Sequence, residues 1–335
     1  MGALLEVKGL SVAFGSGKKS VVVVDDLTFI LKKGETLGIV GESGSGKSVT
    51  SLAVMRLLPK ETARISGEVL LDGSNLLELS DKQMQQIRGN RIAMIFQEPM
   101  TSLNPIQTCG KQIMEPMLLH TDATKAQAKE RALELLRLCG IPDPEQRFRE
   151  YPHQMSGGMR QRIMIAMALA CHPEILIADE PTTALDVTIQ AQILELMKDV
   201  KQKTDMSVIM ITHDLGIVTD FCERVLIFYT GQVVEGGSVR EIFADPKHPY
   251  TEGLLKAIPR IDRSTDRLEA IEGMVPDAGH MPEGCHFHPR CPYAGERCRC
   301  EAPALTEREG GRLVRCHRYT GGTGNANSPE RNTTI

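Results

Sequence analysis

Residues 41–48 have the sequence Gly41-Glu42-Ser43-Gly44-Ser45-Gly46-Lys47-Ser48. This stretch matches the phosphate-binding pattern G-x-x-x-x-G-K-[ST] at every fixed position. The apolar residues 36–40 before it predict a short buried strand, and residues 49–58 after it predict a helix. Strand, loop and helix in this order are the context that the pattern requires. A glycine-rich surface turn would need the lysine, the serine and both flanking elements to be coincidences.

The loop therefore predicts a nucleotide site. Its backbone N–H groups would surround phosphates at the positive end of the following helix. Lys47 is expected to reach the outer phosphates, and the Ser48 hydroxyl to bind Mg²⁺. The other residues expected to bind the nucleotide here are Gly41, Ser43, Gly44, Ser45, Gly46 and Val49.

A second apolar run, residues 175–180, ends in the two carboxylates Asp179 and Glu180. Such a run predicts a central parallel strand, and the carboxyl ends of these strands face the ligand crevice. We expect Asp179 to meet the Mg²⁺ shell, and Glu180 to act as the general base for an attacking water. A lone apolar strand that ends in acids is common, so the prediction of ATP hydrolysis depends on its pairing with the loop.

Between these halves lies a third stretch, Tyr151-Pro152-His153-Gln154-Met155-Ser156-Gly157-Gly158-Met159-Arg160-Gln161-Arg162. It resembles the signature of the ATP-binding cassette (ABC) family. The family's motif order continues with Gln97 after a strand over 92–96, with Ala184-Leu185-Asp186, and with His213 after a strand over 207–212. The resemblance covers about the first 245 residues. It implies an α/β P-loop NTPase fold with an antiparallel β subdomain and a helical subdomain.

The signature predicts a second phosphate clamp. Ser156, Gly157 and Gly158 are expected to open a helix to about residue 170, with a hydroxyl and free N–H groups at its positive end. One nucleotide cannot easily use both clamps of the same chain. The family resolves this with a head-to-tail dimer, in which the signature of one subunit closes on the ATP of the other.

The resemblance also implies roles for single residues. Gln97 would bind Mg²⁺ and sense the transporter, His213 would contact the γ-phosphate, and Asp186 would communicate across the dimer. Phe14 is the best match to the aromatic residue that stacks on adenine, and equally fits a place in the core. Met159 stands where glutamine is commoner, which leaves a side-chain contact to ribose open.

Composition excludes several classes of protein. Lys plus Arg number 39 against 43 Asp plus Glu, a net charge of −4, so no basic excess argues for a nucleic-acid partner. No apolar run approaches the roughly 18 residues that span a bilayer, and residues 1–8 lack the apolar core of a signal peptide. We therefore expect a soluble chain in the cytosol, where the nine cysteines would not be disulfide-paired.

The pattern along the chain predicts its domains. Residues 1–244 form the expected nucleotide-binding domain, and the alternation over 1–35 indicates an antiparallel sheet. Residues 98–171 predict a helical subdomain, with one helix over 124–138. In the family, this subdomain carries the groove that receives a short cytoplasmic helix of the membrane subunit.

The character of the sequence changes after Gly236-Gly237. Residues 245–317 predict a small C-terminal Cys-rich module, and residues 318–335 a disordered tail. The stretch Asp245-Pro246-Lys247-His248-Pro249-Tyr250-Thr251 resembles the C-terminal region of the ATPases of bacterial dipeptide, oligopeptide and nickel importers. The sequence alone reveals no chemistry for its His-Pro-Tyr triplet.

Five of the nine cysteines lie in this module: Cys285, Cys291, Cys298, Cys300 and Cys316. Such density in a cytosolic protein is typical of metal binding. Their spacing lacks the close pairs of a zinc site, whereas iron–sulfur clusters tolerate varied spacing. Some dipeptide-importer ATPases that this chain resembles carry a [4Fe-4S] cluster there, which implies Cys285, Cys291, Cys298 and Cys316 as ligands and Cys300 as the spare. The alternative is reduced, buried thiols that pack a small domain.

The sequence thus predicts an ATP-hydrolysing subunit of a bacterial importer of di- or oligopeptides, at the cytoplasmic face of the inner membrane. Its expected partners are a second, homologous ATPase subunit in a heterodimer, two transmembrane permeases and, indirectly, an extracytoplasmic solute-binding protein. Nickel or another small solute stays open, because the ATPase subunit does not contact the cargo.

The sequence disfavours two other classes of function. A soluble ATPase that acts on ribosomes or DNA usually has tandem cassettes or a coiled-coil insertion, and this chain has one cassette and no sustained heptads. A nucleotide-binding scaffold without turnover is disfavoured by the intact Lys47, Asp179 and Glu180.

Overall fold

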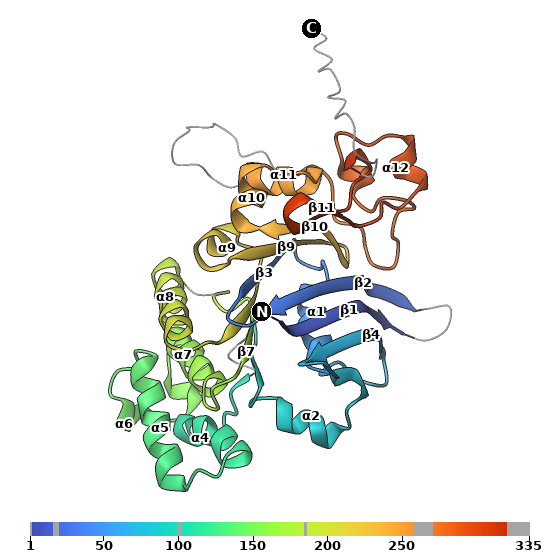
Figure 1. Ribbon diagram of the computed structural model, residues 1–335. Coiled ribbons are helices and arrows are strands. Elements are labelled where there is room, and N and C mark those ends of the chain that lie inside the picture. Colours follow the sequence, from blue (N-terminus) through green and yellow to red (C-terminus); the bar gives the residue numbers. More distant parts are fainter. Residues whose placement is uncertain (1, 16–19, 99–101, 184–185, 258–270, 320–335) are drawn as a thin grey trace.

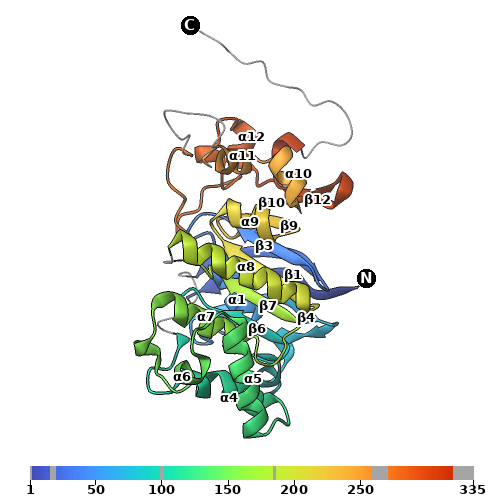
Figure 2. The same cartoon turned by 90° about the vertical axis from the view of Figure 1, so that its left-hand side faces the viewer.

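The computed structural model describes residues 2–15, 20–98, 102–183, 186–257 and 271–319. These residues form a four-stranded sheet and an eight-stranded sheet. In Figure 1 the helices α4 to α6 lie at one end of the molecule and the C-terminal elements at the other. The turned view in Figure 2 shows the same order, with the large sheet between the two ends.

The small sheet is antiparallel and comes from the N-terminal region. Its strands, in the order β2-β1-β4-β5, are β1 (Ala3–Phe14), β2 (Val21–Lys32), β4 (Ala63–Leu71) and β5 (Ser74–Asn75). The alternation over residues 1–35 therefore predicted its start correctly. Buried side chains of this sheet, such as Val12 and Leu31, share a core with Leu37 and Ile39 of β3. The small sheet is thus fixed directly to the central strand of the large one.

The large sheet places the expected parallel strands at its centre. In sheet order its strands are β11 (Thr306–Arg308), β12 (Arg312–Val314), β10 (Gln232–Ser238), β9 (Arg224–Tyr229), β3 (Thr36–Val40), β8 (Ser207–Thr212), β7 (Ile175–Asp179) and β6 (Ile92–Ile95). The five strands from β9 to β6 run parallel, and the other three are antiparallel. Every residue of β3, β7 and β8 is buried. This explains why these strands appear in the sequence as continuous apolar runs.

Helices cover the large sheet and form the region between Gln97 and β7. That region contains α4 (Cys109–His120), α5 (Lys125–Leu138), α6 (Pro144–Arg147), η3 (Pro152–Gln154) and α7 (Gly157–Ala168). The other helices of the described residues are α1 (Lys47–Val54), η2 (Leu76–Glu78), α2 (Asp81–Ile87), α8 (Val187–Lys203), α9 (Leu215–Phe221), α10 (Val239–Ala244), α11 (Pro249–Lys256), η4 (His288–Arg290), α12 (Glu296–Cys300), η5 (Glu309–Gly311) and η6 (His317–Tyr319). None of them combines the length and the apolar character that crossing a membrane requires.

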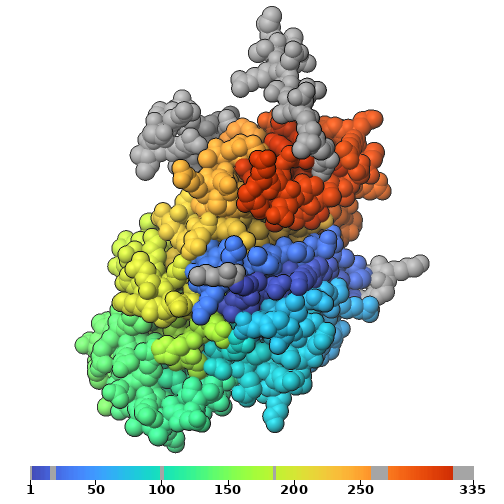
Figure 3. All heavy atoms as spheres, in the orientation of Figure 1, coloured from blue at the N-terminus to red at the C-terminus, as the bar shows by residue number. Residues whose placement is uncertain are grey.

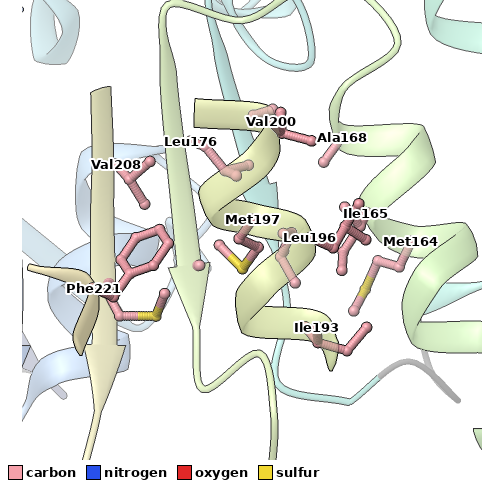
Figure 4. Packing of buried hydrophobic residues seen from close by; sticks show 14 of the residues in the cluster. Met164, Ile165, Ala168, Leu176, Ile193, Leu196, Met197, Val200, Val208 and Phe221 are labelled. Carbon is pink, nitrogen blue, oxygen red and sulfur yellow. The ribbon is translucent and has the colours of Figure 1, made fainter. Parts of the chain in front are cut away.

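One hydrophobic core joins the helical region to the sheet. Figure 4 shows Met164, Ile165 and Ala168 of α7 facing Ile193 and Leu196 of α8. Further labelled members of the same cluster are Met197, Val200, Leu176, Val208 and Phe221. Because interiors are close-packed, α7 cannot shift without disturbing α8 and the strands beneath it.

Some boundaries differ from the sequence-based expectations. The helix expected over 49–58 begins at Lys47, next to a left-handed Gly46 (φ 96°), and ends at Val54, before Arg56 turns to φ 50°. The strand expected over 92–96 ends at Ile95. The expected tail, 318–335, begins within η6, and its remaining residues, 320–335, lie outside the described residues.

The C-terminal residues join the large sheet. Strand β12 pairs with β10, with Glu235 opposite Val314, and a buried ion pair of 2.6 Å links Arg312 to Glu235. In the space-filling view of Figure 3 the red C-terminal surface lies against the blue N-terminal strands. The segment beyond residue 271 is therefore packed on the nucleotide-binding fold.

Candidate nucleotide site

The carboxyl ends of four neighbouring parallel strands carry the predicted site residues. Strand β3 leads into the glycine-rich loop, β8 is followed by His213, β7 ends in Asp179 and continues with Glu180, and β6 is followed by Gln97. Because these strands are adjacent in the order β3-β8-β7-β6, the segments that follow them emerge at one edge of the sheet. Four motifs that are far apart in sequence thus meet in one place.

The glycines of the loop allow close approach of backbone to backbone. A Cβ atom at Gly41 would lie 2.2 Å from the carbonyl oxygen of Phe228, and one at Gly46 would lie 2.8 Å from the carbonyl oxygen of Val23. Gly44 has φ 78° and Gly46 has φ 96°, a left-handed region that glycine adopts at low cost. Any side chain at Gly41 or Gly46 would displace the loop, and with it the N–H groups that would contact phosphate.

Lys47 lies inside the loop and is 5% exposed. Its Nζ atom donates to the carbonyl oxygens of Gly41 at 2.7 Å and of Glu42 at 2.9 Å. Burial lowers the pKa of the Lys47 ammonium, and the two carboxylates at the end of β7 partly oppose that shift. The ammonium is therefore held next to the loop backbone, in position to bind an anion that enters the loop.

Ser48 and Asp179 form a pair of oxygen ligands. The Ser48 hydroxyl, in the first turn of α1, donates to Oδ1 of Asp179, the last residue of β7, at 3.0 Å. Asp179 is 4% exposed, and burial raises its pKa to about 6. A hydroxyl and a carboxylate side by side are the hard oxygen donors that Mg²⁺ prefers. The donor set therefore fits the predicted magnesium site.

Glu180 has a strained backbone and an oriented side chain. Its φ is 46°, a left-handed value that costs energy for a residue with a Cβ, and its N–H donates to the carbonyl oxygen of Ile211 at 2.9 Å. The carboxylate accepts hydrogen bonds from Thr183 at 2.8 Å and from Gln97 at 3.0 Å, and its other oxygen lies 3.4 Å from Nδ1 of His213. The Glu180 carboxylate thus has a hydrogen bond from Gln97 and lies 3.4 Å from His213, so the three expected catalytic residues are in one place. Thr183 was not among the residues predicted from the sequence, although a hydroxyl three residues after a carboxylate in a turn is a usable signal.

The signature lies apart from this group. Ser156 is the exposed N-cap of α7, and its hydroxyl accepts from the N–H of Met159 at 3.3 Å. At Gly157 there is open space where a Cβ would be, and at Gly158 a Cβ would lie 3.0 Å from Cγ2 of Ile189. Among the described residues, the Ser156 side chain contacts no part of the phosphate loop through a hydrogen bond. This helix end is open to a ligand that comes from outside the chain.

Asp186 and Phe14 have contacts of their own. Asp186 is the N-cap of α8 and accepts from the N–H of Ile189 at 2.9 Å, while the preceding residues 184 and 185 lie outside the described ones. Phe14 is the last residue of β1, pairs with Val21 and Ala63, and packs partly buried against the core of the small sheet. Its place at the edge of this core fits both readings made from the sequence.

Four C-terminal cysteines lie around one cavity. Cys285, Cys291, Cys298 and Cys316 line a space of about 20 Å³, and the exposed Cys300 does not. Burial raises the pKa of the thiols of Cys285 and Cys316, and that of Cys291 to about 11. In the described part of the chain, however, no group of three or more His, Cys, Asp or Glu side chains is arranged to hold a metal ion. The predicted [4Fe-4S] cluster is therefore not supported by the geometry of the site and stays a prediction.

Two family models match the chain. Residues 24–183 match the family described as "ABC transporter". Residues 234–298 match the family described as "Oligopeptide/dipeptide transporter, C-terminal region". The first match contains the phosphate loop and the end of β7, and the second contains the His-Pro-Tyr triplet and three of the cavity cysteines.

Curated proteins and solved structures resemble the chain over most of its length. It is 51% identical over 320 residues to the oligopeptide transport ATP-binding protein AppD of Bacillus subtilis, covering 95% of this chain and 98% of that protein. It is 54% identical over 316 residues to the dipeptide transport ATP-binding protein DppD of Haemophilus influenzae, covering 94% and 95%. A dimeric, post-hydrolysis structure of the ATP-binding cassette MJ0796 with ADP and Pi aligns with TM-score 0.63 at 28% identity, covering 70% of this chain and 99% of that one.

Proposed function

The chain belongs to the ATP-binding proteins of ABC transporters, and from this premise we propose that it hydrolyses ATP to energise the import of di- or oligopeptides. The observation that carries the proposal is the group at the ends of the parallel strands, where Lys47, the Ser48–Asp179 pair and the oriented Glu180 converge. The peptide substrate is supported by the names of the relatives and by the match to the oligopeptide/dipeptide C-terminal region. The fold itself supports ATP hydrolysis and is neutral about the cargo.

The loop and the Ser48–Asp179 pair bind the substrate in this proposal. Lys47, held beside the loop carbonyls, reaches the outer phosphates, and the glycine-rich backbone donates N–H groups to them. Ser48, Asp179 and Gln97 would hold Mg²⁺, which when bound neutralises charge on the transferred phosphoryl group. The rest of the cradle would be formed by Gly41, Ser43, Gly44, Ser45, Gly46 and Val49.

Glu180 accepts the proton of the attacking water. The hydrogen bonds from Thr183 and Gln97 fix one carboxylate oxygen, which leaves the other directed toward the side of His213. An oriented carboxylate loses little freedom when it meets the water, which is the usual advantage of a positioned general base. His213 would contact the γ-phosphate, in agreement with its exposed position after β8.

The signature acts on a second subunit in this proposal. The open N-terminus of α7, with Ser156, Gly157 and Gly158, would bind the nucleotide of a partner, and Asp186 would communicate across the same interface. The similarity to a dimeric cassette supports this head-to-tail arrangement. Phe14 would stack on the adenine at the edge of the small sheet. We propose that residues 1–244 and 245–317 are the two functional units, with residues 98–171 as the subdomain that meets the membrane subunits.

The complete transporter would contain more proteins than this chain. Proteins of this family work with membrane permeases and a second ATPase subunit. We propose a homologous, non-identical partner ATPase, two permeases and an extracytoplasmic binding protein, with this chain at the cytoplasmic face of the inner membrane. The [4Fe-4S] cluster on Cys285, Cys291, Cys298 and Cys316 is also part of the proposal. It comes from the density of cysteines in the sequence and from the resemblance to dipeptide-importer ATPases.

Reconstitution tests the function. The chain, its partner ATPase and both permeases are placed in proteoliposomes with the binding protein inside the donor compartment, and uptake of labelled dipeptide is compared with uptake of nickel. Peptide uptake that requires ATP and disappears in Lys47→Ala would support the proposal. Nickel uptake alone would change the cargo, and ATP hydrolysis without any association with permeases would favour a soluble ATPase.

A further inference from the structure

The phosphate loop is held from outside by the C-terminal part of the chain. The N–H of Glu42 donates to the phenol oxygen of Tyr250 at 3.0 Å. The Glu42 carboxylate accepts two hydrogen bonds from Arg290, at 2.9 Å from Nη1 and 3.2 Å from Nη2. These partners lie 208 and 248 residues along the chain, so only the tertiary fold brings them to the loop.

Tyr250 contacts the Gly41–Glu42 peptide, which also contacts Lys47. The carbonyl of Gly41 and the N–H of Glu42 belong to the same planar peptide group. The carbonyl oxygen accepts from Nζ of Lys47 at 2.7 Å, and the N–H donates to Tyr250. Rotation of this peptide would therefore break the lysine contact and the tyrosine contact together. Tyr250 fixes the orientation in which the carbonyl faces the lysine.

The fold holds Tyr250 rigidly in this position. Its ring is fully buried and packs against Tyr229 and Phe287, with centroid distances of 4.7 and 5.4 Å. Its N–H donates to Nδ1 of His248 at 3.1 Å, and the N–H of His248 donates to Glu235 of β10 at 2.9 Å. The His-Pro-Tyr triplet thus starts α11 and attaches it to the sheet. This attachment fixes the position of the Tyr250 phenol relative to the phosphate loop.

Arg290 is also held in place. Its side chain is 5% exposed, and its guanidinium lies 5.8 Å from the ring centroid of Tyr229. Its Nε donates to the carbonyl oxygen of Glu272 at 3.1 Å. A two-pronged, charge-assisted contact in such surroundings defines direction as well as distance. Arg290 therefore restrains the Glu42 side chain at the mouth of the loop.

We propose that Tyr250 and Arg290 are positioning residues of the phosphate loop, which hold the Gly41–Glu42 peptide in the orientation that binds ATP. The proposal rests on the proposed function, since it assigns the loop to ATP. The C-terminal region would then contribute to ATP binding, through its two contacts with the phosphate loop. Loss of either residue leaves the loop sequence intact but makes the loop less ordered before ATP binds. ATP binding then has to order the loop, and the free energy that this costs weakens the affinity.

Single substitutions test the two contacts. Tyr250→Phe keeps the packed ring and removes the acceptor of the Glu42 N–H, and Arg290→Ala removes the ion pair. In the full chain, each is expected to raise the Kd for a fluorescent ATP analogue by about 3- to 10-fold, the range of one lost hydrogen bond or partly buried ion pair. The matched controls are Tyr293→Phe and Arg297→Ala, which remove a phenol and an exposed ion pair of the same region that do not reach the loop. Unchanged Kd values in both test variants would overturn the proposal.

A double-mutant cycle separates positioning from simple loss of structure. Glu42→Ala and Arg290→Ala remove the same contact, so the double variant is expected to bind ATP no more weakly than the weaker single variant. Tyr250→Phe acts on the backbone of residue 42, so its effect should persist in Glu42→Ala. Arg290→Lys should recover only part of the affinity, because an ammonium cannot reproduce the paired contact. Additive effects of Glu42→Ala and Arg290→Ala would contradict the contact.

Kinetics of the assembled transporter give an independent readout. A loop that is less ordered before binding affects the ground state and the transition state alike, so KM should rise while kcat stays near the wild-type value. A fall in kcat with unchanged KM would contradict a positioning role. Lys47→Ala distinguishes a wrong ATP site from a wrong role for Tyr250 and Arg290. If Lys47→Ala leaves ATP binding unchanged, the proposed site is wrong. If Lys47→Ala weakens binding and the Tyr250 and Arg290 variants do not, only the role of these two residues is wrong.

Discussion

Two regions of this molecule gather reactive side chains, and they are built in opposite ways. At the ends of the parallel strands, Lys47, Asp179 and Glu180 each have polar partners that fix their orientation. Around the C-terminal cavity, four thiols face a space of about 20 Å³, between short elements such as η4 and α12. Burial raises the pKa of three of these thiols and so disfavours their thiolate form. The first region is organised for charge, and the second is organised as an apolar pocket.

The comparison shows where a substitution should act. A buried parallel strand places its last residue with little freedom, so changes at the strand ends act on chemistry directly. In the described part of the chain, the hydrogen bonds from the C-terminal region to the loop come from Tyr250 and Arg290. Changes among its cysteines should therefore be felt at the ATP site as small changes in affinity. The following four predictions test this order, from the largest expected effect to the smallest.

Glu180→Gln has the largest expected effect. The amide keeps the shape of the side chain but cannot accept a proton as a base, so kcat for ATP hydrolysis should fall by about 100-fold or more while ATP binding is retained. The closed dimer should accumulate with bound ATP, which gel filtration can measure. Glu174→Gln is the matched control, because Glu174 precedes β7 at the opposite end of the strand, in an exposed ion pair with Arg91. Hydrolysis near the wild-type rate in Glu180→Gln would show that Glu180 is not the general base. Substitutions at the strand ends would then not act more directly on chemistry than those in the C-terminal region.

Ser156→Arg comes next and acts on the partner. The substitution places a large side chain on the open end of α7, so it should block closure of the dimer and leave this chain's own nucleotide affinity nearly unchanged. In the assembled complex, nucleotide trapping with the two ATPase subunits resolved should show loss at the partner's site. Ser238→Arg, at the N-cap of α10, is the control for the loss of a capping serine. Selective loss at this chain's own Lys47 site would contradict the head-to-tail arrangement.

The sequence predicted the first region far better than the second. Strands over 36–40 and 207–212 match their predicted limits, because runs buried on both faces are apolar throughout. The phosphate loop follows from local chemistry at fixed spacing. The contacts of Glu42 with Tyr250 and Arg290 left no pattern in the sequence, because they join segments more than 200 positions apart.

Local conformation explains the other misses. The left-handed backbone at Arg56 ends α1 early, and a non-glycine residue at such a position gives no warning in the sequence. Glu180 likewise takes a left-handed conformation that its residue type does not predict. Strand β12 has three residues, too few for a periodic signal, so its pairing with β10 was not expected.

The third prediction concerns pH and Asp179. Because burial raises its pKa to about 6, from an ordinary value of about 4, the folded chain keeps a proton between these pH values that the unfolded chain has released. The free energy of unfolding should therefore fall as pH rises from about 4 to 6 and stay lower above that. Asp179→Asn cannot ionise, so in magnesium-free buffer at pH 8 its Tm should exceed that of the wild type by about 2–6 °C. The difference should vanish near pH 4, and Asp220→Asn, at an exposed position, is the control.

The smallest expected effect at the ATP site comes from the cysteines. If four thiolates hold a [4Fe-4S] cluster, protein purified without oxygen should contain iron and sulfide near four each per chain. Cys298→Ser should lose both and raise the Kd for ATP only a few-fold, through the loosened support of Arg290, because no residue of the phosphate loop is among those that line the cavity. Cys300→Ser is the control and should keep the cluster, since Cys300 is exposed and outside the cavity. One zinc per chain would replace the cluster by a structural zinc site, and absence of metal would leave a pocket of packed thiols. A loss of ATP binding in Cys298→Ser as large as that of Lys47→Ala would mean that the two regions are not separate in function.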